Sequence, residues 1–176
     1  MCGIVGITGS DRSVEILLNG LKSLEYRGYD SAGIYVNDQA GHDYLVKRPG
    51  RISNLESALT PDVHGLAGIG HTRWATHGEP SEANAHPQYS TDERFYLVHN
   101  GVIENYKQLK EEYLSDVDFK SQTDTEVIVQ LVDKFVVEYE MDTKAALVKV
   151  LRLISDDSAY AFVSVSYTHL RAHETE

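Results

Sequence analysis

The sequence predicts an α+β fold in which sheets and helices form separate layers. Segments with strand-like composition occur along the whole chain and are interspersed with segments of helical periodicity. Two of these strands, residues 31–37 and 42–48, are separated by the turn 38–41 and predict an antiparallel hairpin. The regular strand–helix alternation of a doubly wound parallel sheet is missing, so the pattern favours a layered fold with antiparallel pairing.

The first part of the chain predicts two strands and a helix before the hairpin is complete. Residues 2–8 alternate small and β-branched side chains, which is typical of a buried strand. Residues 9–11 predict a turn that supplies a helix N-cap, and apolar side chains at helical spacing predict a helix over residues 13–26. The run 27–30 ends that helix, and the second strand begins at Ser31.

The middle of the chain predicts a short helix, a strand and a long polar loop. The helix is expected over residues 51–59 and the strand over 66–71, where Gly68 and Gly70 indicate close approach of another segment. Residues 72–89 have no period and are rich in His, Pro, Asn and Gly. A loop of this length in a small domain usually carries function.

The last part predicts a strand, three helices and a final strand. Residues 94–99 are strand-like and end at Asn100-Gly101, a strong turn signal. Helices are expected over residues 105–114, after a cap at 121–124, and over 143–154. Another strand begins at residues 159–163.

Composition restricts the class of protein. The chain has 176 residues, enough for one domain, and a net charge of -11, which argues against nucleic acid or an anionic membrane as the main partner. No apolar run approaches the length of a membrane-spanning helix, and no secretory signal is evident. The single cysteine cannot form an internal disulfide, so a cytoplasmic protein with a free thiol is expected.

Cys2 is the first candidate for chemistry. Removal of Met1 would leave Cys2 with both a thiol nucleophile and a free α-amine that accepts protons near neutral pH. A lone cysteine is more often a small buried hydrophobic residue. Its place at the start of a predicted strand favours the catalytic interpretation.

Three further positions complement such a nucleophile. Asn100 and Gly101 offer a side-chain amide and a backbone N–H for an oxyanion, although the residues alone favour an ordinary hairpin turn. Arg73, in the long loop beside Trp74, Thr76 and His77, presents a planar fork suited to a carboxylate, with a solvated surface arginine as the alternative. Asp124 is either a helix-capping acid or a partner for an ammonium group.

A metal site and other cofactor sites are not expected. His71, His77, His86 and His99 follow no compact zinc spacing, so structural roles are favoured for them. A phosphate loop and a dinucleotide-binding fingerprint are both missing. We therefore predict no cofactor.

Several motifs together resemble one family. The segments MCGIVGI, LEYRGYDSAGI, GHTRWATHG, NAHP, HNGVIENY and TDTEVI are similar to the glutaminase domain of the glutamine–fructose-6-phosphate aminotransferase family, which belongs to the class II glutamine amidotransferases and the N-terminal nucleophile hydrolases. MCGIVGI alone is shared with related amidotransferases, whereas YRGYDSAGI and HTRWATHG are more specific. The resemblance covers residues 1–164.

The resemblance implies a fold and a chemistry. The fold is a four-layer αββα sandwich of antiparallel sheets, incomplete at its C-terminal end. Cys2 is the implied nucleophile, with Asn100 and Gly101 as the oxyanion hole. Arg73 and Asp124 hold the two ends of L-glutamine, and Trp74, Thr76 and His77 lie on a loop that closes over it. Arg27 and His86 are implied as supporting residues.

The resemblance also implies partners that this chain lacks. Ammonia from glutamine would pass to C-terminal sugar-phosphate isomerase domains, where fructose-6-phosphate becomes glucosamine-6-phosphate, in a parent protein expected to be a homodimer. The alternatives are another class II amidotransferase, a non-catalytic amidotransferase-like binding module, or an inactive gene fragment.

The last residues do not fit the rest of the chain. Residues 165–176, VSYTHLRAHETE, turn polar where a core strand should continue, and they resemble a sequencing-adapter read-through. We therefore expect a glutaminase domain over residues 1–164 and a non-native tail over 165–176. The other interpretation is a genuine frayed terminus.

Overall fold

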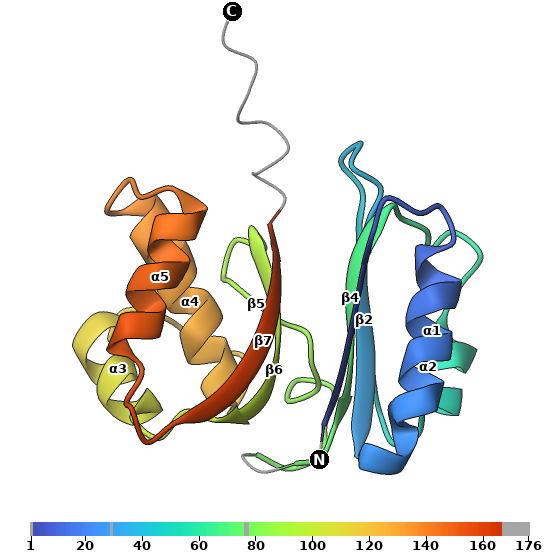
Figure 1. The fold of residues 1–176 in the computed structure, drawn as a ribbon, viewed down its shortest axis with the longest axis horizontal. Helices are drawn as coiled ribbons and strands as arrows, with labels where there is room; N and C mark the ends of the chain where they lie inside the picture. Colours follow the sequence, from blue (N-terminus) through green and yellow to red (C-terminus); the bar gives the residue numbers. More distant parts are fainter. Residues whose placement is uncertain (1, 29, 76–77, 167–176) are drawn as a thin grey trace, which may run out of the picture.

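The computed structural model describes residues 2–28, 30–75 and 78–166, and these form two antiparallel sheets packed face to face between two layers of helices (Figure 1). This is the four-layer αββα sandwich that the resemblance implied. Helices α1 and α2 cover the outer face of one sheet, and α3, α4 and α5 cover the outer face of the other.

The first sheet has four strands in the order β1-β4-β2-β3, and all neighbours are antiparallel. Its elements are β1 Gly3–Thr8, α1 Ser13–Leu24, the 3₁₀ turn η1 Glu25–Arg27, β2 Ser31–Asn37, β3 Asp43–Pro49, α2 Ile52–Ala58 and β4 Ala67–Arg73. The predicted hairpin of β2 and β3 is confirmed, and β4 runs two residues further than expected.

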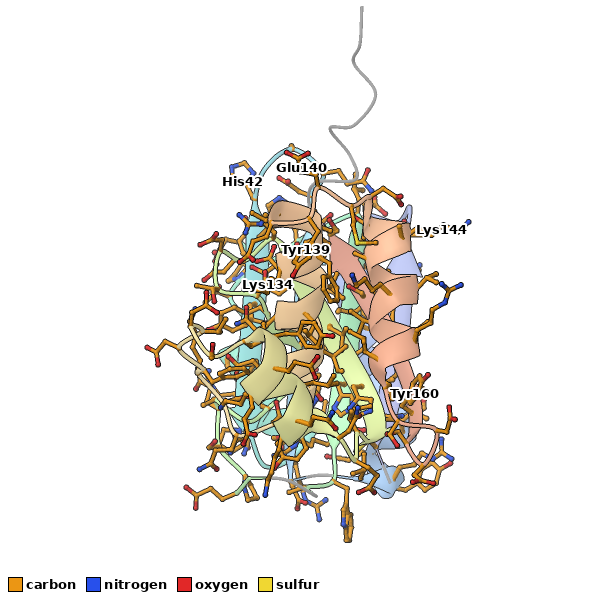
Figure 2. The ribbon with its side chains drawn as sticks, turned by 90° about the vertical axis from the view of Figure 1, so that its left-hand side faces the viewer. His42, Lys134, Tyr139, Glu140, Lys144 and Tyr160 are labelled. Atoms are coloured by element: carbon orange, nitrogen blue, oxygen red, sulfur yellow. The ribbon has the colours of Figure 1, made fainter. Side chains whose placement is uncertain are left out.

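The second sheet has three strands in the order β5-β6-β7. Its elements are β5 Gln88–Tyr89, β6 Phe95–Val102, α3 Tyr106–Tyr113, α4 Asp124–Val137, α5 Thr143–Leu153 and β7 Ala159–Ser166. Figure 2 faces the helical layer of this half and shows Lys134 and Tyr139 near the end of α4 and Lys144 on α5. β7 continues through Val165 and Ser166, which pair with Tyr96 and Phe95.

Three apolar clusters stabilise the layers. One lies between α1, α2 and the first sheet and includes Leu17, Leu21 and Ile34. A second packs α3, α4 and α5 on the second sheet. The third lies between the sheets, where Tyr35 stacks on Tyr96 with ring centroids 3.7 Å apart. The inner faces of the two sheets therefore form a core of their own.

Gly68 and Gly70 lie where close approach was predicted. A Cβ at Gly68 would come within 2.6 Å of Val36, and one at Gly70 within 3.0 Å of Leu21. The missing side chains allow α1 and β2 to pack closely on β4.

Two local predictions were wrong. The N-cap of α1 is Arg12, which forms no side-chain capping bond, instead of a residue within 9–11. Asn100 and Gly101 do not form a hairpin turn; they lie inside β6 and pair with Ala161 and Tyr160 of β7. Pairing with a strand about 60 residues away along the chain outweighs the local turn signal.

None of the helices in the described part of the chain is long and apolar enough to cross a membrane.

Candidate functional site

Cys2 lies directly before β1, beside the end of β4. The pairing of β1 with β4 sets Gly3 opposite Thr72, which brings the thiol to the segment after Arg73. The backbone N–H of Trp74 donates a hydrogen bond to the Cys2 Sγ atom at 3.2 Å. A backbone donor at this distance stabilises a thiolate, the nucleophilic form of cysteine.

Cys2 shares one small cavity with residues from four other parts of the chain. The cavity measures about 10 Å³, about the size of one water molecule. Its lining comes from the start of β1, the end of β4, the loop before β5, β6 and the start of α4: Cys2, Arg73, Trp74, His86, His99, Gly101, Thr123, Asp124 and Thr125. Segments about 100 residues apart in the sequence therefore meet at the thiol.

Asn100 and Gly101 approach Cys2 from the second sheet. The Asn100 side-chain Nδ2 donates a hydrogen bond to the backbone carbonyl oxygen of Cys2 at 3.2 Å. Gly101 has φ of 131°, a conformation that glycine adopts and other residues rarely do. A side-chain amide nitrogen and a glycine backbone position of β6 therefore lie beside Cys2.

Asp124 is the first residue of α4 and is almost completely buried. Thr123 caps the helix, since its hydroxyl accepts a hydrogen bond from the Glu126 N–H. One carboxylate oxygen of Asp124, Oδ2, accepts a bond from the Ile103 N–H at 2.8 Å. The cap and this bond hold the carboxylate at the wall of the cavity.

Arg73, at the end of β4, is buried against the same cavity. Burial lowers the pKa of its guanidinium, while negative charge on Cys2, Asp124 and Asp30 opposes that shift. An arginine stays a cation at neutral pH despite such a shift. The site therefore holds one buried cation and one buried carboxylate near a thiol.

Asp30, which does not line the cavity, holds the segment after Arg73 through two hydrogen bonds. The Asp30 Oδ2 atom accepts a hydrogen bond from the Ala75 N–H at 2.9 Å, and the Asp30 N–H donates to the Arg73 carbonyl at 3.1 Å. Asp30 was not predicted as a site residue, because nothing in its local pattern distinguishes it from an ordinary turn residue.

Three buried histidines support the cavity. His71 and His86 stack with ring centroids 4.4 Å apart. Thr125 Oγ1 contacts both His86 Nε2, at 2.7 Å, and His99 Nδ1, at 3.0 Å. Burial lowers the pKa of His71 to about 4 and that of His86 well below its ordinary value, so both rings are neutral at pH 7.

The remaining predicted site residues differ in where they lie. Trp74 lines the cavity and leaves 51% of its surface exposed. Arg27 lies in η1 and does not line the cavity. Thr76 and His77 lie outside the described residues. Thr123 and Thr125 line the cavity but were not predicted, although the run SQTDTE contains them.

Within the described ranges, no group of three His, Cys, Asp or Glu side chains is arranged to hold a metal ion.

Known proteins that are similar to this chain are glutamine amidotransferases. The model of the glutamine amidotransferase domain family matches residues 61–143. The glutamine–fructose-6-phosphate aminotransferase (isomerizing) of Lactiplantibacillus plantarum is 69% identical over 163 residues, which are 93% of this chain and 27% of that protein. The Lactococcus lactis protein of the same name is 56% identical over the same shares. The chain spans about a quarter of the length of these relatives.

Solved structures support the same fold. The glutamine phosphoribosylpyrophosphate amidotransferase from B. subtilis, in complex with ADP and GMP, superposes with a TM-score of 0.80 at 28% identity. The match covers 95% of this chain and 35% of that one. A structure described as the allosteric regulatory enzyme of purine biosynthesis gives the same TM-score and identity.

Proposed function

Because this chain belongs to the glutamine amidotransferase family, we propose that its cavity is a glutaminase centre in which Cys2 attacks the side-chain amide of L-glutamine. The observation that carries the proposal is the meeting of Cys2 with Arg73, Gly101 and Asp124 around one cavity, with Asn100 bonded to Cys2. These groups come from both sheets and one helix, and together they match a nucleophile, an oxyanion donor and the two charged ends of an α-amino acid.

The proposed reaction has two steps. After removal of Met1, the Cys2 α-amine accepts the thiol proton, and Sγ adds to the amide carbon. The Asn100 amide and the Gly101 N–H stabilise the resulting oxyanion. Collapse of this intermediate breaks the C–N bond while the α-ammonium group of Cys2 returns its proton to the leaving nitrogen, so ammonia is released and a γ-glutamyl thioester remains. Water then hydrolyses the thioester to give glutamate and restores the thiol.

Charge complementarity selects the substrate in this proposal. Arg73 binds the α-carboxylate of glutamine through its planar fork, and Asp124 binds the α-ammonium group. Trp74, Thr76 and His77 belong to the segment that closes over the bound amino acid. The cavity measures about 10 Å³, which is smaller than glutamine, so glutamine binding requires its lining to widen.

We extend the proposal to the parent protein. Identities of 69% and 56% to glutamine–fructose-6-phosphate aminotransferases, against 28% to the purine-pathway structure, favour the first activity over the second. The ammonia would then serve fructose-6-phosphate conversion in C-terminal isomerase domains of a homodimer. The cytoplasm is the proposed compartment, because a catalytic thiol stays reduced there.

Replacement of Cys2 tests the glutaminase proposal. In the purified protein, Cys2→Ala should abolish glutamate release from glutamine while glutamine still binds, since the charged contacts remain. Mass spectrometry of the active protein should find Cys2 at the N-terminus. Turnover by Cys2→Ala, or activity with Met1 retained, contradicts the proposal. Glutamine binding without turnover in the unaltered protein would instead identify a binding module.

A further inference from the structure

His71 is a completely buried residue of β4 that joins the two sheets behind the nucleophile. Its register neighbours within the first sheet are Ile4 of β1 and Gly33 of β2. Its side chain, however, contacts the second sheet at β6. His71 was predicted to have only a structural role, and this contact places it next to a residue of the proposed site.

One nitrogen of His71 makes both contacts to β6. His71 Nε2 lies 2.9 Å from the backbone carbonyl oxygen of His99 and 2.9 Å from the side-chain Oδ1 of Asn100. The opposite atom of the same amide, Asn100 Nδ2, donates to the carbonyl oxygen of Cys2. The Asn100 amide is therefore held at both ends, by His71 on one side and by the nucleophile's own residue on the other.

The chemistry of these contacts determines the tautomer of His71. Both partners of Nε2 are acceptors, so Nε2 must carry the proton. A neutral imidazole has a single N–H, which leaves Nδ1 without one; among the described residues Nδ1 has no hydrogen-bond partner, and the ring stacks on His86. Burial lowers the pKa of His71 to about 4, so this neutral form persists across the physiological range.

We infer that His71 is a positioning residue for the oxyanion hole: its Nε2–H holds Asn100 Oδ1 so that the Asn100 amide N–H groups point toward the reacting carbonyl. This inference rests on the proposed glutaminase function. An amide nitrogen carries two N–H groups, so one contacts Cys2 and one remains for the oxyanion. Without the donor at Oδ1, the amide is restrained only through Cys2, the residue that changes most during the reaction.

The effect should appear in catalysis and not in substrate binding. Arg73 and Asp124 hold the ends of glutamine in the proposal, whereas the hydrogen bonds and the ring contact of His71 go to His99, Asn100 and His86. Loss of the His71 donor should therefore lower kcat and leave KM nearly unchanged, because the oxyanion exists only after attack.

Two amide substitutions at position 71 form a matched pair. Glutamine places its amide N–H near the position of the imidazole Nε2, whereas asparagine is shorter and reaches only the position of Nδ1. Both remove the ring that stacks on His86, so they share any cost in packing. We expect His71→Gln to keep kcat within about fivefold and His71→Asn to lower it about 10- to 100-fold, with KM within about twofold in each.

A double-mutant cycle distinguishes action through Asn100 from a general structural effect. In an Asn100→Ala background, His71→Asn should lower kcat little further, because the group that it positions is gone. Inhibitor binding gives a second measurement. His71→Asn should weaken an aldehyde analogue of glutamine, which forms a tetrahedral adduct with the thiol, about tenfold or more, and leave L-glutamate binding within about twofold.

The outcomes are separable. If the unaltered protein shows no glutaminase activity, the proposed function fails before His71 is tested. If it is active and His71→Asn equals His71→Gln, or if the effects of His71→Asn and Asn100→Ala are additive, the positioning role is wrong. Equal weakening of the aldehyde and of L-glutamate would also overturn it. Circular dichroism and thermal melting of both variants establish that they are folded.

Discussion

Arg73 is a buried cation whose geometry should matter more than its charge. A guanidinium binds a carboxylate through two parallel N–H groups, and a lysine ammonium does not reproduce that fork. We expect Arg73→Lys to raise KM for glutamine about 10- to 100-fold with a smaller change in kcat, as measured by steady-state glutamate release. The matched control is Arg48→Lys, since Arg48 is partly exposed and pairs with Glu82 away from the cavity. A KM unchanged by Arg73→Lys would contradict the assignment of Arg73 to the substrate carboxylate.

Lys47 should make stability depend on pH. Burial lowers the pKa of Lys47 to about 8, from 10.5 in an unfolded chain. Below pH 8 both states are protonated, and the folded state bears the full cost of a buried ammonium. Between pH 8 and 10.5 the unfolded state binds more protons, so the free energy of unfolding rises with pH.

The substitution Lys47→Met should therefore stabilise the protein at pH 7, by on the order of 3 kcal/mol, and the gain should shrink toward pH 10. Urea unfolding at both pH values measures this difference. Lys120→Met is the control, because Lys120 lies over the same Tyr89 ring but is exposed. A gain that is independent of pH would show that packing, and not ionisation, is responsible.

At the residue scale, the sequence predicted the residues that carry reactive or charged groups better than the residues that hold those groups in place. Cys2, Arg73 and Asp124 each had an ordinary alternative, and the family resemblance favoured the site role; the structure brings all three to one cavity. His71 does not stand out, since its partner Asn100 lies 29 positions away and on another sheet. Only the packing of the two sheets creates that contact.

At the element scale, Gly28 holds the end of η1 against the end of β4. A Cβ at Gly28 would come within 3.0 Å of both the Arg73 carbonyl carbon and the Trp74 nitrogen, which are backbone atoms that cannot simply rotate away. We expect Gly28→Ala to displace this peptide and with it the Trp74 N–H that contacts Cys2 Sγ. Glutaminase kcat should fall about tenfold or more.

The control for Gly28→Ala is Gly6→Ala in β1, where an added Cβ meets only Val163 at 3.9 Å, an ordinary contact. This variant should keep its activity. Equal activity of Gly28→Ala and the unaltered protein would show that the Arg73–Trp74 peptide tolerates displacement, and that the Trp74 N–H is not needed at the thiol.

Strands and helices were predicted where local pattern and tertiary packing agree. The β2 strand, residues 31–37, was predicted with its exact bounds because β-branched and small residues sit between clear turn signals. The turn predicted at Asn100-Gly101 was wrong because both residues are part of β6. Gly101 adopts a positive φ there, at the cavity that Cys2 lines. Predictions from local sequence fail most often for residues that belong to a functional or strained site.

At the scale of the whole molecule, the alternation pattern alone predicted only an α+β fold, because single-chain periodicity does not say which strands pair. The four-layer arrangement came from the resemblance, and the structure confirms it. The packing of one sheet on the other depends on contacts such as Tyr35 on Tyr96, which join residues 61 positions apart on different sheets. The proposed boundary between residues 164 and 165 remains a prediction, since β7 continues through both.

The two sheets leave edge strands open on the same side of the sandwich. In the described ranges β1 and β7 each have one strand neighbour, and between them lies a hollow of about 430 Å³ lined by residues of both, among them Ile7, Val163 and Val165. Unpaired strand edges beside apolar side chains favour association with another strand. We therefore expect the 176-residue chain to self-associate in a concentration-dependent way.

The substitution Val163→Lys should reduce this association, because an inward-pointing charge at an edge opposes pairing with a second copy. Light scattering after size-exclusion chromatography should show a shift from oligomer toward monomer. Val148→Lys on α5 is the matched control, since Val148 and Val163 are both 38% exposed but only Val163 borders the hollow. If both variants reduce association equally, the added charge and not the open edge is responsible. If neither variant reduces association, the copies contact each other through another surface.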